Sequence, residues 1–490
     1  MKSRIIFGLV FALIASTAGA KAPDYAPAPK PRPLAMAKTG FDLVKAAGFT
    51  GQTGFIVIDA QTGTVFEAFQ PNLPLPPASV AKVPTALYAL DQLGPDFRFQ
   101  TQLLARGTVN AGDLRGDLIL KGQGGPELDS DDLVELIASS GLRSVSGQFL
   151  IDAGPGTIAE QIDNTQPITA AYNPSVSGLN LNFNRVYMEW KRRNGRYDMV
   201  MEARAETVSP QVNVVTMKIV DQTDGGEVFH HRMTDKAEAW QVARSALGKK
   251  GGRWLPVRNA NRHVGDVFRT LAADRGLTLP LSGDTTGAQG TVIATHLSRP
   301  LIDTVRAMLK YSTNLTAEAI GVTATRTTQS ASRLETSARA MNEWAHAFIG
   351  PGPGVLSMTN HSGLSGDSRA SAGRLAALLL AAEAKPINNA PFSSLLKPFP
   401  VTERGTADPR YPAIVRAKTG TLNFTSALAG YVDVEDGRRL IFAIISADVP
   451  RRAATANPAV ERPRGARTWG ARAKRLQRAL LRSWIDRFGR

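Results

Sequence analysis

The chain has 490 residues, of which 43% are hydrophobic and 20% are charged, and these values predict an ordinary globular protein of two or three domains. It has no cysteine, which excludes disulfide frameworks, zinc–thiolate sites and cysteine nucleophiles. The net charge of +16 favours anionic partners, but no basic motif is interleaved with aromatic residues, so we expect no nucleic-acid binding.

The first twenty residues have the three parts of a secretory signal peptide. A basic start precedes an apolar run over residues 5–15, which is too short to span a bilayer comfortably. Residues 18–20 are Ala-Gly-Ala, which fits the rule of small residues at a cleavage site. We therefore expect a cleaved leader over residues 1–20 and a periplasmic protein whose mature chain begins at Lys21. An uncleaved anchor is the alternative.

Residues 21–98 begin with a linker and lead into a buried helix. The stretch 21–40 is rich in Pro, Ala and Lys, which predicts an extended linker. A short helix at 41–47 follows, and then strands at 54–59 and 64–69 that are joined by a polar turn. We expect these two strands to form a hairpin.

A serine and a lysine three residues apart open the next helix. Ser79 and Lys82 stand after a proline-rich lead-in and before an apolar run at 86–90. Pro84 fits a helix that begins near Ser79, because proline is tolerated only near a helix N-terminus. Residues i and i+3 share a helix face, so the Ser79 hydroxyl and the Lys82 amine can meet. A desolvated, neutral lysine can deprotonate a serine, and a free N–H in the first turn can stabilise an oxyanion.

Between residues 99 and 294 the pattern changes to many short strands with few helices. We interpret this segment as an inserted α+β region of one or two subdomains. Its expected strands lie at 99–104, 118–120, 148–151, 186–201 and 212–220, and its expected helices lie at 131–139 and 268–273.

Helical periodicity returns after the inserted region. Helices are expected at 301–309, 316–323, 334–348 and 371–382, strands at 426–432 and 439–446, and a basic amphipathic helix at 469–488. We predict an α/β (α+β) fold in which residues 41–98 and 295–490 form one domain. This domain is an antiparallel sheet flanked by helices, and the region 99–294 interrupts it.

Two later clusters follow the serine–lysine pair in a fixed order. Ser312 and Asn314 form a Ser-x-Asn motif on a helical stretch, and Lys-Thr-Gly-Thr at 418–421 directly precedes a strand. Each cluster alone is a weak signal, because a second Ser-x-x-Lys at 394–397 precedes proline and a second Lys-Thr-Gly at 38–40 precedes no strand. The ordered trio is the signature of penicillin-binding proteins and serine β-lactamases. Simple helix capping is the alternative role for Ser312 and Asn314.

With these motifs the chain resembles the class C low-molecular-mass penicillin-binding proteins, the D-alanyl-D-alanine carboxypeptidase/endopeptidase family. Ser79 and Ser312 are 233 positions apart, which is far more than a class A β-lactamase has between the same motifs. The resemblance covers nearly the whole mature chain and includes Ser-Gly-Leu-Ser at 362–365. The chain departs from the usual family pattern in three places. It has Asn360-His361 where Asp-Gly is usual, Gly124-Gly125-Pro126 where Gly-Asp-Pro is usual, and Gly366 where arginine is usual.

The resemblance implies an acyl-enzyme mechanism on peptidoglycan stem peptides, inhibition by β-lactams, and no need for a metal or cofactor. Ser79 is then the nucleophile that attacks the carbonyl between two D-alanines, and Lys82 is its base. Lys418 helps to keep Lys82 neutral, because a nearby like charge disfavours protonation. Ser312 relays a proton to the departing amine.

The same resemblance implies the contacts that hold the substrate. Asn314 bonds the peptide amide of the substrate. Lys418, Thr419 and Thr421 hold its terminal carboxylate. The backbone N–H groups of Ser79 and Thr421 form the oxyanion hole.

Two other functions and two placements of the last helix are kept as alternatives. A serine β-lactamase or esterase on the same fold is one rival function, and a non-catalytic cell-wall binding protein is the other. The helix at 469–488 either packs against the sheet, which we favour, or lies on an anionic membrane. Its arginines allow peripheral contact with an anionic membrane or wall polymer.

Overall fold

The computed structural model describes residues 38–154, 158–235, 237–330, 333–402, 410–455 and 460–489. The expected signal peptide, and all but the last three residues of the expected linker, lie outside these ranges. Within them, no helix is both long enough and apolar enough to cross a membrane.

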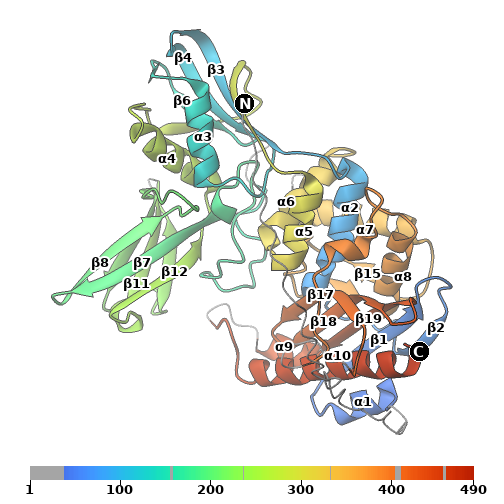
Figure 1. Cartoon of the computed structure of the whole chain (residues 1–490). Helices are drawn as coiled ribbons and strands as arrows, with labels where there is room; N and C mark the ends of the chain where they lie inside the picture. The colour runs from blue at the N-terminus through green and yellow to red at the C-terminus, as the bar shows by residue number, and fades with distance from the viewer. Residues whose placement is uncertain are drawn as a thin grey trace, which may run out of the picture. The chain divides into compact units, whose positions relative to one another are not determined.

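A five-stranded antiparallel sheet joins strands from the two ends of the chain (Figure 1). Its order is β17-β18-β19-β1-β2, so the hairpin of β1 and β2 lies beside three strands that come from far along the sequence. The hairpin and the β18–β19 pair agree with the sequence-based predictions. The strands are β1 (Gln52–Asp59), β2 (Val65–Phe69), β17 (Ile414–Leu422), β18 (Thr425–Asp433) and β19 (Arg439–Ala447).

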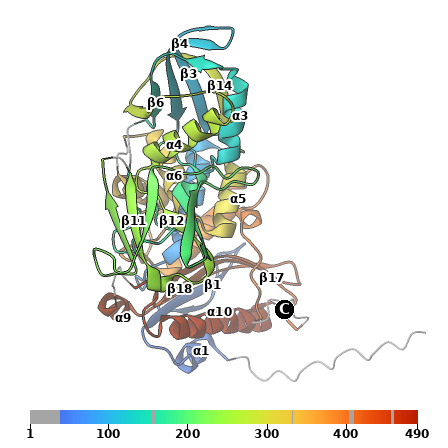
Figure 2. The same ribbon diagram turned by 90° about the vertical axis from the view of Figure 1, so that its left-hand side faces the viewer.

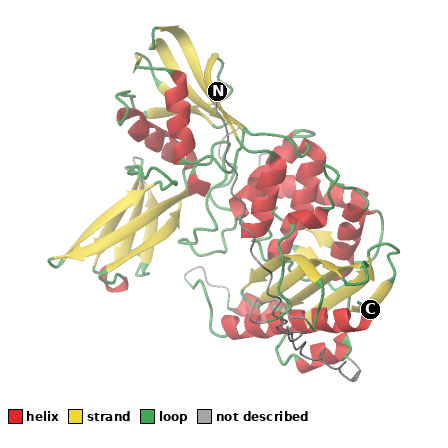
Figure 3. Ribbon diagram, in the orientation of Figure 1, coloured by secondary structure: helices red, strands yellow, loops and turns green. Residues whose placement is uncertain are grey.

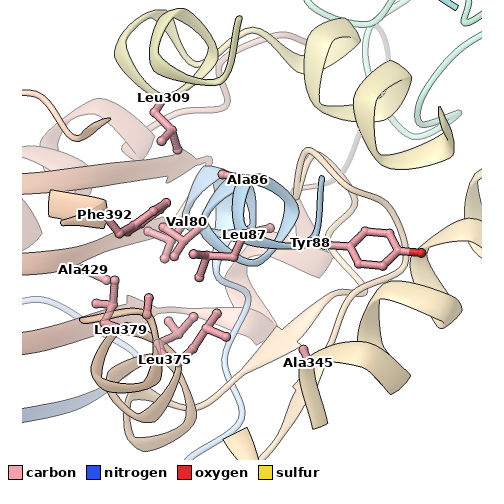
Figure 4. Close-up of a cluster of buried hydrophobic side chains, with 14 of the residues drawn as sticks. Val80, Ala86, Leu87, Tyr88, Leu309, Ala345, Leu375, Leu379, Phe392 and Ala429 are labelled. Carbon is pink, nitrogen blue, oxygen red and sulfur yellow. The ribbon is translucent and has the colours of Figure 1, made fainter. Parts of the chain in front are cut away.

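One face of this sheet is covered by helices that pack around α2. The side chains of Val80, Leu87 and Tyr88 lie at the centre of this core (Figure 4). We expected α2 to begin near Ser79, but a 3₁₀ turn, η1, precedes it. The elements are η1 (Ala78–Ala81), α2 (Lys82–Leu93), α5 (Leu301–Tyr311), α6 (Asn314–Arg326), α7 (Leu334–Ile349), α8 (Ala372–Glu383) and η4 (Phe392–Leu395).

The opposite face is covered by the last helix, α10 (Ala466–Phe488), with the short helix α1 (Gly40–Ala46) beside it (Figures 1 and 2). Strand alternation explains this division, because Phe442 and Ile444 of β19 face α10 while Ala443 and Ile445 face the helices around α2. The expected packing of the last helix against the sheet is therefore confirmed. Contact between α10 and a membrane stays a prediction.

The segment between α2 and α5 forms three further sheets and two helices (Figure 3). A six-stranded sheet of order β13-β6-β4-β3-β14, with β5 beside β4, packs against α3 and α4. Two three-stranded sheets have the orders β12-β7-β8 and β10-β11-β9. The helices are α3 (Ser130–Ser140) and α4 (Ala260–Ala273), with 3₁₀ turns η2 (Asn182–Asn184) and η3 (Arg244–Ala246). The strands are β3 (Gln100–Asn110), β4 (Asp113–Gly122), β5 (Ser144–Val145), β6 (Phe149–Asp152), β7 (Arg185–Arg193), β8 (Arg196–Glu202), β9 (Val215–Val220), β10 (Phe229–Met233), β11 (Glu238–Ala243), β12 (Lys250–Pro256), β13 (Ser282–Thr285) and β14 (Thr291–Leu297).

The main hydrophobic cores follow the expected division of the chain, whereas a smaller core crosses it, in which Ile162 and Val176 pack with Leu315, Val322, Leu334 and Leu364. The main core of the inserted segment draws only on residues 103–294. The cores on the two faces of the five-stranded sheet draw only on residues before 100 and after 300. This separation supports the predicted domain boundaries, which stay a prediction.

The structure also differs from the sequence-based expectations. The Lys-Thr-Gly-Thr motif lies inside β17, whereas we expected it to precede a strand. This strand was missed because the charged residues Arg416 and Lys418 interrupt its apolar pattern. α4 begins well before the expected 268–273, because the side chain of Asn259 caps it by accepting from the Arg262 N–H at 3.0 Å. The short elements α9 (Val449–Ala454), β15 (Leu356–Ser357) and β16 (Arg369–Ala370) were not expected.

Replacement of Trp484 by alanine should lower the free energy of unfolding by about 3–5 kcal/mol. The indole is fully buried against the sheet beside Phe55 and Phe442, and its Nε1 donates to Glu67 at 2.8 Å. Denaturant unfolding measures the loss. Arg475→Ala, on the exposed face of the same helix, is the control and should change stability by about 0.5 kcal/mol or less. Wild-type stability of the tryptophan variant would contradict packing of α10 on the sheet.

Candidate active site

Ser79 lies in η1, the tight turn that joins the proline-rich lead-in to α2. The preceding Ala78 has φ of +48°, a left-handed conformation that non-glycine residues rarely adopt. Gly420 of β17 packs so closely on this turn that a Cβ atom there would lie 2.5 Å from the Pro77 carbonyl oxygen. Gly363 packs on the turn as well, since its Cβ would collide with the Ala78 carbonyl oxygen. The two glycines therefore let separate segments approach the serine.

The amine of Lys82 is completely buried and has three hydrogen-bond acceptors. Its Nζ lies 3.1 Å from Ser79 Oγ, 2.7 Å from Asn314 Oδ1 and 2.8 Å from the Ser362 carbonyl oxygen. The structure thus brings the Ser-x-x-Lys motif together with the asparagine of the Ser-x-Asn motif.

Ser312 and Asn314 occupy the break between α5 and α6, whereas we expected the motif to lie on a helical stretch. Ser312 ends α5 with φ of +61°, and its Oγ accepts a hydrogen bond from Lys418 Nζ at 2.9 Å. Asn314 opens α6, and its Nδ2 donates to the Tyr172 carbonyl oxygen at 2.9 Å. The N-cap residue of α6 is Thr313, which makes no side-chain cap bond. The side chains of Ser312 and Asn314 are therefore engaged at the site and not in helix capping.

β17 is an edge strand of the sheet, and among the described residues only part of its outer edge is paired. The segment 397–399 pairs with its first half, where the Ala417 N–H donates to the Lys397 carbonyl oxygen at 3.1 Å. Backbone groups alternate in direction along a strand, so the N–H of Thr421 points to the same outer edge as that of Ala417. The Thr421 N–H accordingly lies at the uncovered end of this edge.

The Lys-Thr-Gly-Thr motif is divided between the two faces of β17. Lys418 and Gly420 share one face, and alternation places the side chains of Thr419 and Thr421 on the other. Thr421 is exposed, whereas Thr419 is half-buried and its carbonyl oxygen accepts from Lys418 Nζ at 2.7 Å. Contact between the Thr419 hydroxyl and a substrate carboxylate stays a prediction.

A cleft of about 1100 Å³ opens at the serine. The inserted region supplies part of its wall, through residues 161–167 and Tyr172. The expected site residues that line the cleft are Ser79, Ser312, Asn314 and Thr421. Across the described ranges, no cluster of three or more histidine or acidic side chains is arranged to hold a metal ion.

Burial depresses the pKa of both site lysines. The pKa of Lys82 lies well below its usual range because of burial first and the like charge of Lys418 second, while Glu318 opposes the shift. Burial lowers the pKa of Lys418 to about 7, and the charge of Lys397 adds to this effect. We expected Lys418 to disfavour protonation of Lys82, and the structure agrees in direction but makes burial the larger cause.

Three groups at the site were missed from the sequence: the carboxylate of Glu318 and the carbonyl oxygens of Ser362 and Tyr172. Glu318 is fully buried and accepts from the N–H groups of His361 at 3.0 Å and Ser362 at 2.8 Å. A glutamate in an otherwise apolar stretch, one turn after Asn314, was the available signal. Backbone carbonyls carry no such signal.

The second copies of two motifs, Ser-x-x-Lys at 394–397 and Lys-Thr-Gly at 38–40, are decoys that have structural roles. Ser394 is exposed in η4, and Lys397 is exposed while its carbonyl oxygen covers the edge of β17. Thr39, in the second Lys-Thr-Gly, caps α1 by accepting from the Asp42 N–H at 3.3 Å. The sequence context separated these copies correctly from the motifs at the site.

Comparison with known families identifies the chain. The model of the D-Ala-D-Ala carboxypeptidase 3 (S13) family matches residues 46–462. The chain belongs to this family. The membership confirms the family that the three ordered motifs predicted, and it makes the chain a member of a family of serine-type D-alanyl-D-alanine carboxypeptidases.

Curated relatives of this S13 family member are also carboxypeptidases. The D-alanyl-D-alanine carboxypeptidase DacB of Haemophilus influenzae is 24% identical over 302 residues, which cover 57% of this chain and 60% of that protein. The D-alanyl-D-alanine carboxypeptidase of Actinomadura sp. strain R39 is 26% identical over 432 residues, which cover 80% of this chain and 77% of that protein.

Solved structures confirm the predicted fold of the S13 family member. Penicillin binding protein 4 (dacB) from Haemophilus influenzae superposes with a TM-score of 0.68 at 20% identity, over 89% of this chain and 97% of that one. The same protein in complex with a β-lactam superposes with a TM-score of 0.70 at 18% identity, over 92% and 99% of the two chains.

The Nζ signal of Lys418 in protein with ¹⁵N-labelled lysine should titrate with a midpoint near pH 7, far below the ordinary 10.5, because burial disfavours the ammonium form. Loss of the signal in Lys418→Gln assigns it. Lys397→Ala should move the midpoint upward, since it removes a like charge. A midpoint near 10.5 would contradict the electrostatics of the site.

Proposed function

We propose that this S13 family member is a D-alanyl-D-alanine carboxypeptidase and endopeptidase that cleaves peptidoglycan stem peptides through an acyl-enzyme on Ser79. One observation carries the proposal: the buried amine of Lys82 lies 3.1 Å from Ser79 Oγ, and its other two acceptors are carbonyl oxygens. Carbonyl oxygens accept but never donate, so a neutral amine gives its two N–H groups to them. Its lone pair then faces the hydroxyl, as a general base requires.

Acylation uses the groups around this pair. Ser79 Oγ attacks the carbonyl carbon between the two D-alanines while Lys82 takes the hydroxyl proton. The N–H groups of Ser79 and Thr421 stabilise the oxyanion, and each such donor contributes about 3–4 kcal/mol in comparable sites. The C–N bond then breaks, and the proton that Lys82 took passes through Ser312, which is hydrogen-bonded to Lys418, to the departing amine of D-alanine, so that Lys82 is neutral again. Water hydrolyses the ester and frees the serine.

Substrate binding follows from the uncovered end of β17. An extended peptide can pair with a free strand edge, and this places its C-terminus near Lys418 and Thr421. The ammonium of Lys418, with the hydroxyls of Thr419 and Thr421, holds the terminal carboxylate. One hydrogen of Asn314 Nδ2 is used by Tyr172, so the second is free to bond the substrate amide.

The proposed surroundings of the enzyme follow from its substrate. Peptidoglycan lies outside the cytoplasmic membrane, so we place the protein in the periplasm, exported by the leader at 1–20. β-Lactams should acylate the same serine, as the β-lactam complex of the H. influenzae protein suggests. Exposed arginines of α10, among them Arg467, Arg472 and Arg475, are available for anionic membrane or wall polymer. We assign catalysis to residues 41–98 and 295–490.

Labelled penicillin should attach covalently to the purified protein, and Ser79→Ala should abolish the label, because the hydroxyl that forms the ester is lost. Mass spectrometry of the labelled peptide checks the position. Ser394→Ala, in the decoy motif, is the matched control and should label like wild type. Labelling that persists in Ser79→Ala would refute the assignment. Rapid release of the label from the wild-type protein, as hydrolysed penicillin, would favour a β-lactamase.

Lys82→Arg should reduce the rate of acylation by about 100- to 10,000-fold, the range typical for loss of a general base. Arginine keeps the positive charge but cannot be deprotonated. Stopped-flow measurement of penicillin acylation gives the rate, and circular dichroism confirms that the variant is folded. The exposed Lys397→Arg serves as control. An unchanged rate in Lys82→Arg would show that another group is the base.

A further inference from the structure

The direction of the Lys82 lone pair depends on the backbone carbonyl of Ser362, which takes no part in the reaction itself. Two carbonyl oxygens must accept the N–H groups of the neutral amine, and one of them belongs to Ser362. Ser362 lies in a short connection, residues 360–363, which we call the 360–363 loop. If this carbonyl turned away, the amine would lose one acceptor and its lone pair would no longer be directed at Ser79.

The 360–363 loop is held by side chains from two buried helices. Glu318 of α6 accepts from the His361 N–H through Oε2 at 3.0 Å and from the Ser362 N–H through Oε1 at 2.8 Å. Thr85 of α2 donates from Oγ1 to the His361 carbonyl oxygen at 2.7 Å. The side chains of Glu318 and Thr85 are both inaccessible to solvent. The loop is therefore fixed through its peptide groups next to the carbonyl that Lys82 uses.

We infer that Glu318 is a positioning residue: its carboxylate fixes the 360–363 loop so that the Ser362 carbonyl oxygen accepts from Lys82 and the lone pair of Lys82 is left for Ser79. This inference rests on the proposed function, in which Lys82 is the base. Two consecutive N–H donors need a partner that only accepts, and a carboxylate has two such oxygens. Glutamine would offer one oxygen, and its NH₂ group would face the second N–H.

Glu318 also acts on Lys82 through charge. The charged groups that face Lys82 are Lys418 on β17, which lowers its pKa, and Glu318 on α6, which raises it. The 360–363 loop adds His361, which is neutral because burial lowers its pKa to about 3. Burial raises the pKa of Glu318, while its two N–H donors and Lys82 oppose that shift. Loss of the carboxylate should therefore make Lys82 easier to deprotonate.

The test is the pH profile of penicillin acylation in Glu318→Gln. Displacement of the Ser362 carbonyl should lower the plateau rate by about tenfold or more, because catalysis is sensitive to shifts of an ångström. Loss of the negative charge should move the acidic limb to lower pH, since the pKa of Lys82 falls. Glu318→Asp keeps the charge but shortens the side chain, so its plateau should fall while its acidic limb stays in place.

The inserted region offers a matched control. Glu238 is also buried, and its Oε1 accepts from the N–H groups of Arg258 at 2.8 Å and Asn259 at 2.6 Å. Glu238→Gln also removes a buried carboxylate, but its amide oxygen can still accept both N–H groups, because both bond Oε1 alone. It should leave both plateau and limb of the acylation profile unchanged. Thr85→Val, which loosens the 360–363 loop without changing a charge, replaces Glu318→Gln if that variant does not fold. It should lower the plateau with no movement of the limb.

The outcomes separate this inference from the proposed function. If Lys82→Arg does not acylate, and Glu318→Gln has a reduced plateau and a shifted acidic limb, both the proposed function and the role of Glu318 are supported. If Lys82→Arg does not acylate, but Glu318→Gln is folded and acylates with the wild-type pH profile, Glu318 has only a structural role and the inference is wrong. If Lys82→Arg acylates normally, the proposed base is wrong whatever Glu318 does.

Discussion

A lysine amine without access to water needs an acceptor for each N–H that it carries, and the site depends on how Lys82 meets this need. Its hydrogen-bond partners, two carbonyl oxygens and the Ser79 hydroxyl, come from the start of α6, from the 360–363 loop and from η1, which are far apart in the sequence. The fold must therefore hold three segments against one atom. The close approach at Gly363 and Gly420 shows how little room the serine turn leaves for side chains.

The architecture explains why this arrangement tolerates a long insertion. α2 is packed into the core on one face of a sheet whose strands come from both ends of the chain, and α10 closes the other face. The inserted segment has its own main core, and a smaller core joins its Ile162 and Val176 to Leu315 and Val322 of α6. The inserted segment also contributes directly to the site: Tyr172 holds Asn314 through a carbonyl oxygen, and residues 161–167 form part of the cleft wall.

The sequence predicted the parts of this site that depend on residue type and order. Ser79, Lys82, Ser312 and Lys418 were identifiable because the three motifs occur in one order, and the decoy at 394–397 was excluded by its proline. The break between α5 and α6 was not predictable, because a left-handed serine leaves no periodic trace. Glu318 was missed since its partners are backbone N–H groups, and the strands β5 and β10 to β14 of the inserted segment were missed because they are short or because polar residues interrupt their alternation.

The partial cover on β17 has a consequence for the fate of the protein in a crowded compartment. A free strand edge is a template on which other chains can pair and aggregate. Residues 397–399 occupy one half of this edge, and the other half lies beside a cleft. A single extended peptide can enter such a recess, whereas a strand that belongs to a folded sheet carries neighbours too wide to follow it. The walls that shape the cleft thus also protect the molecule from self-association.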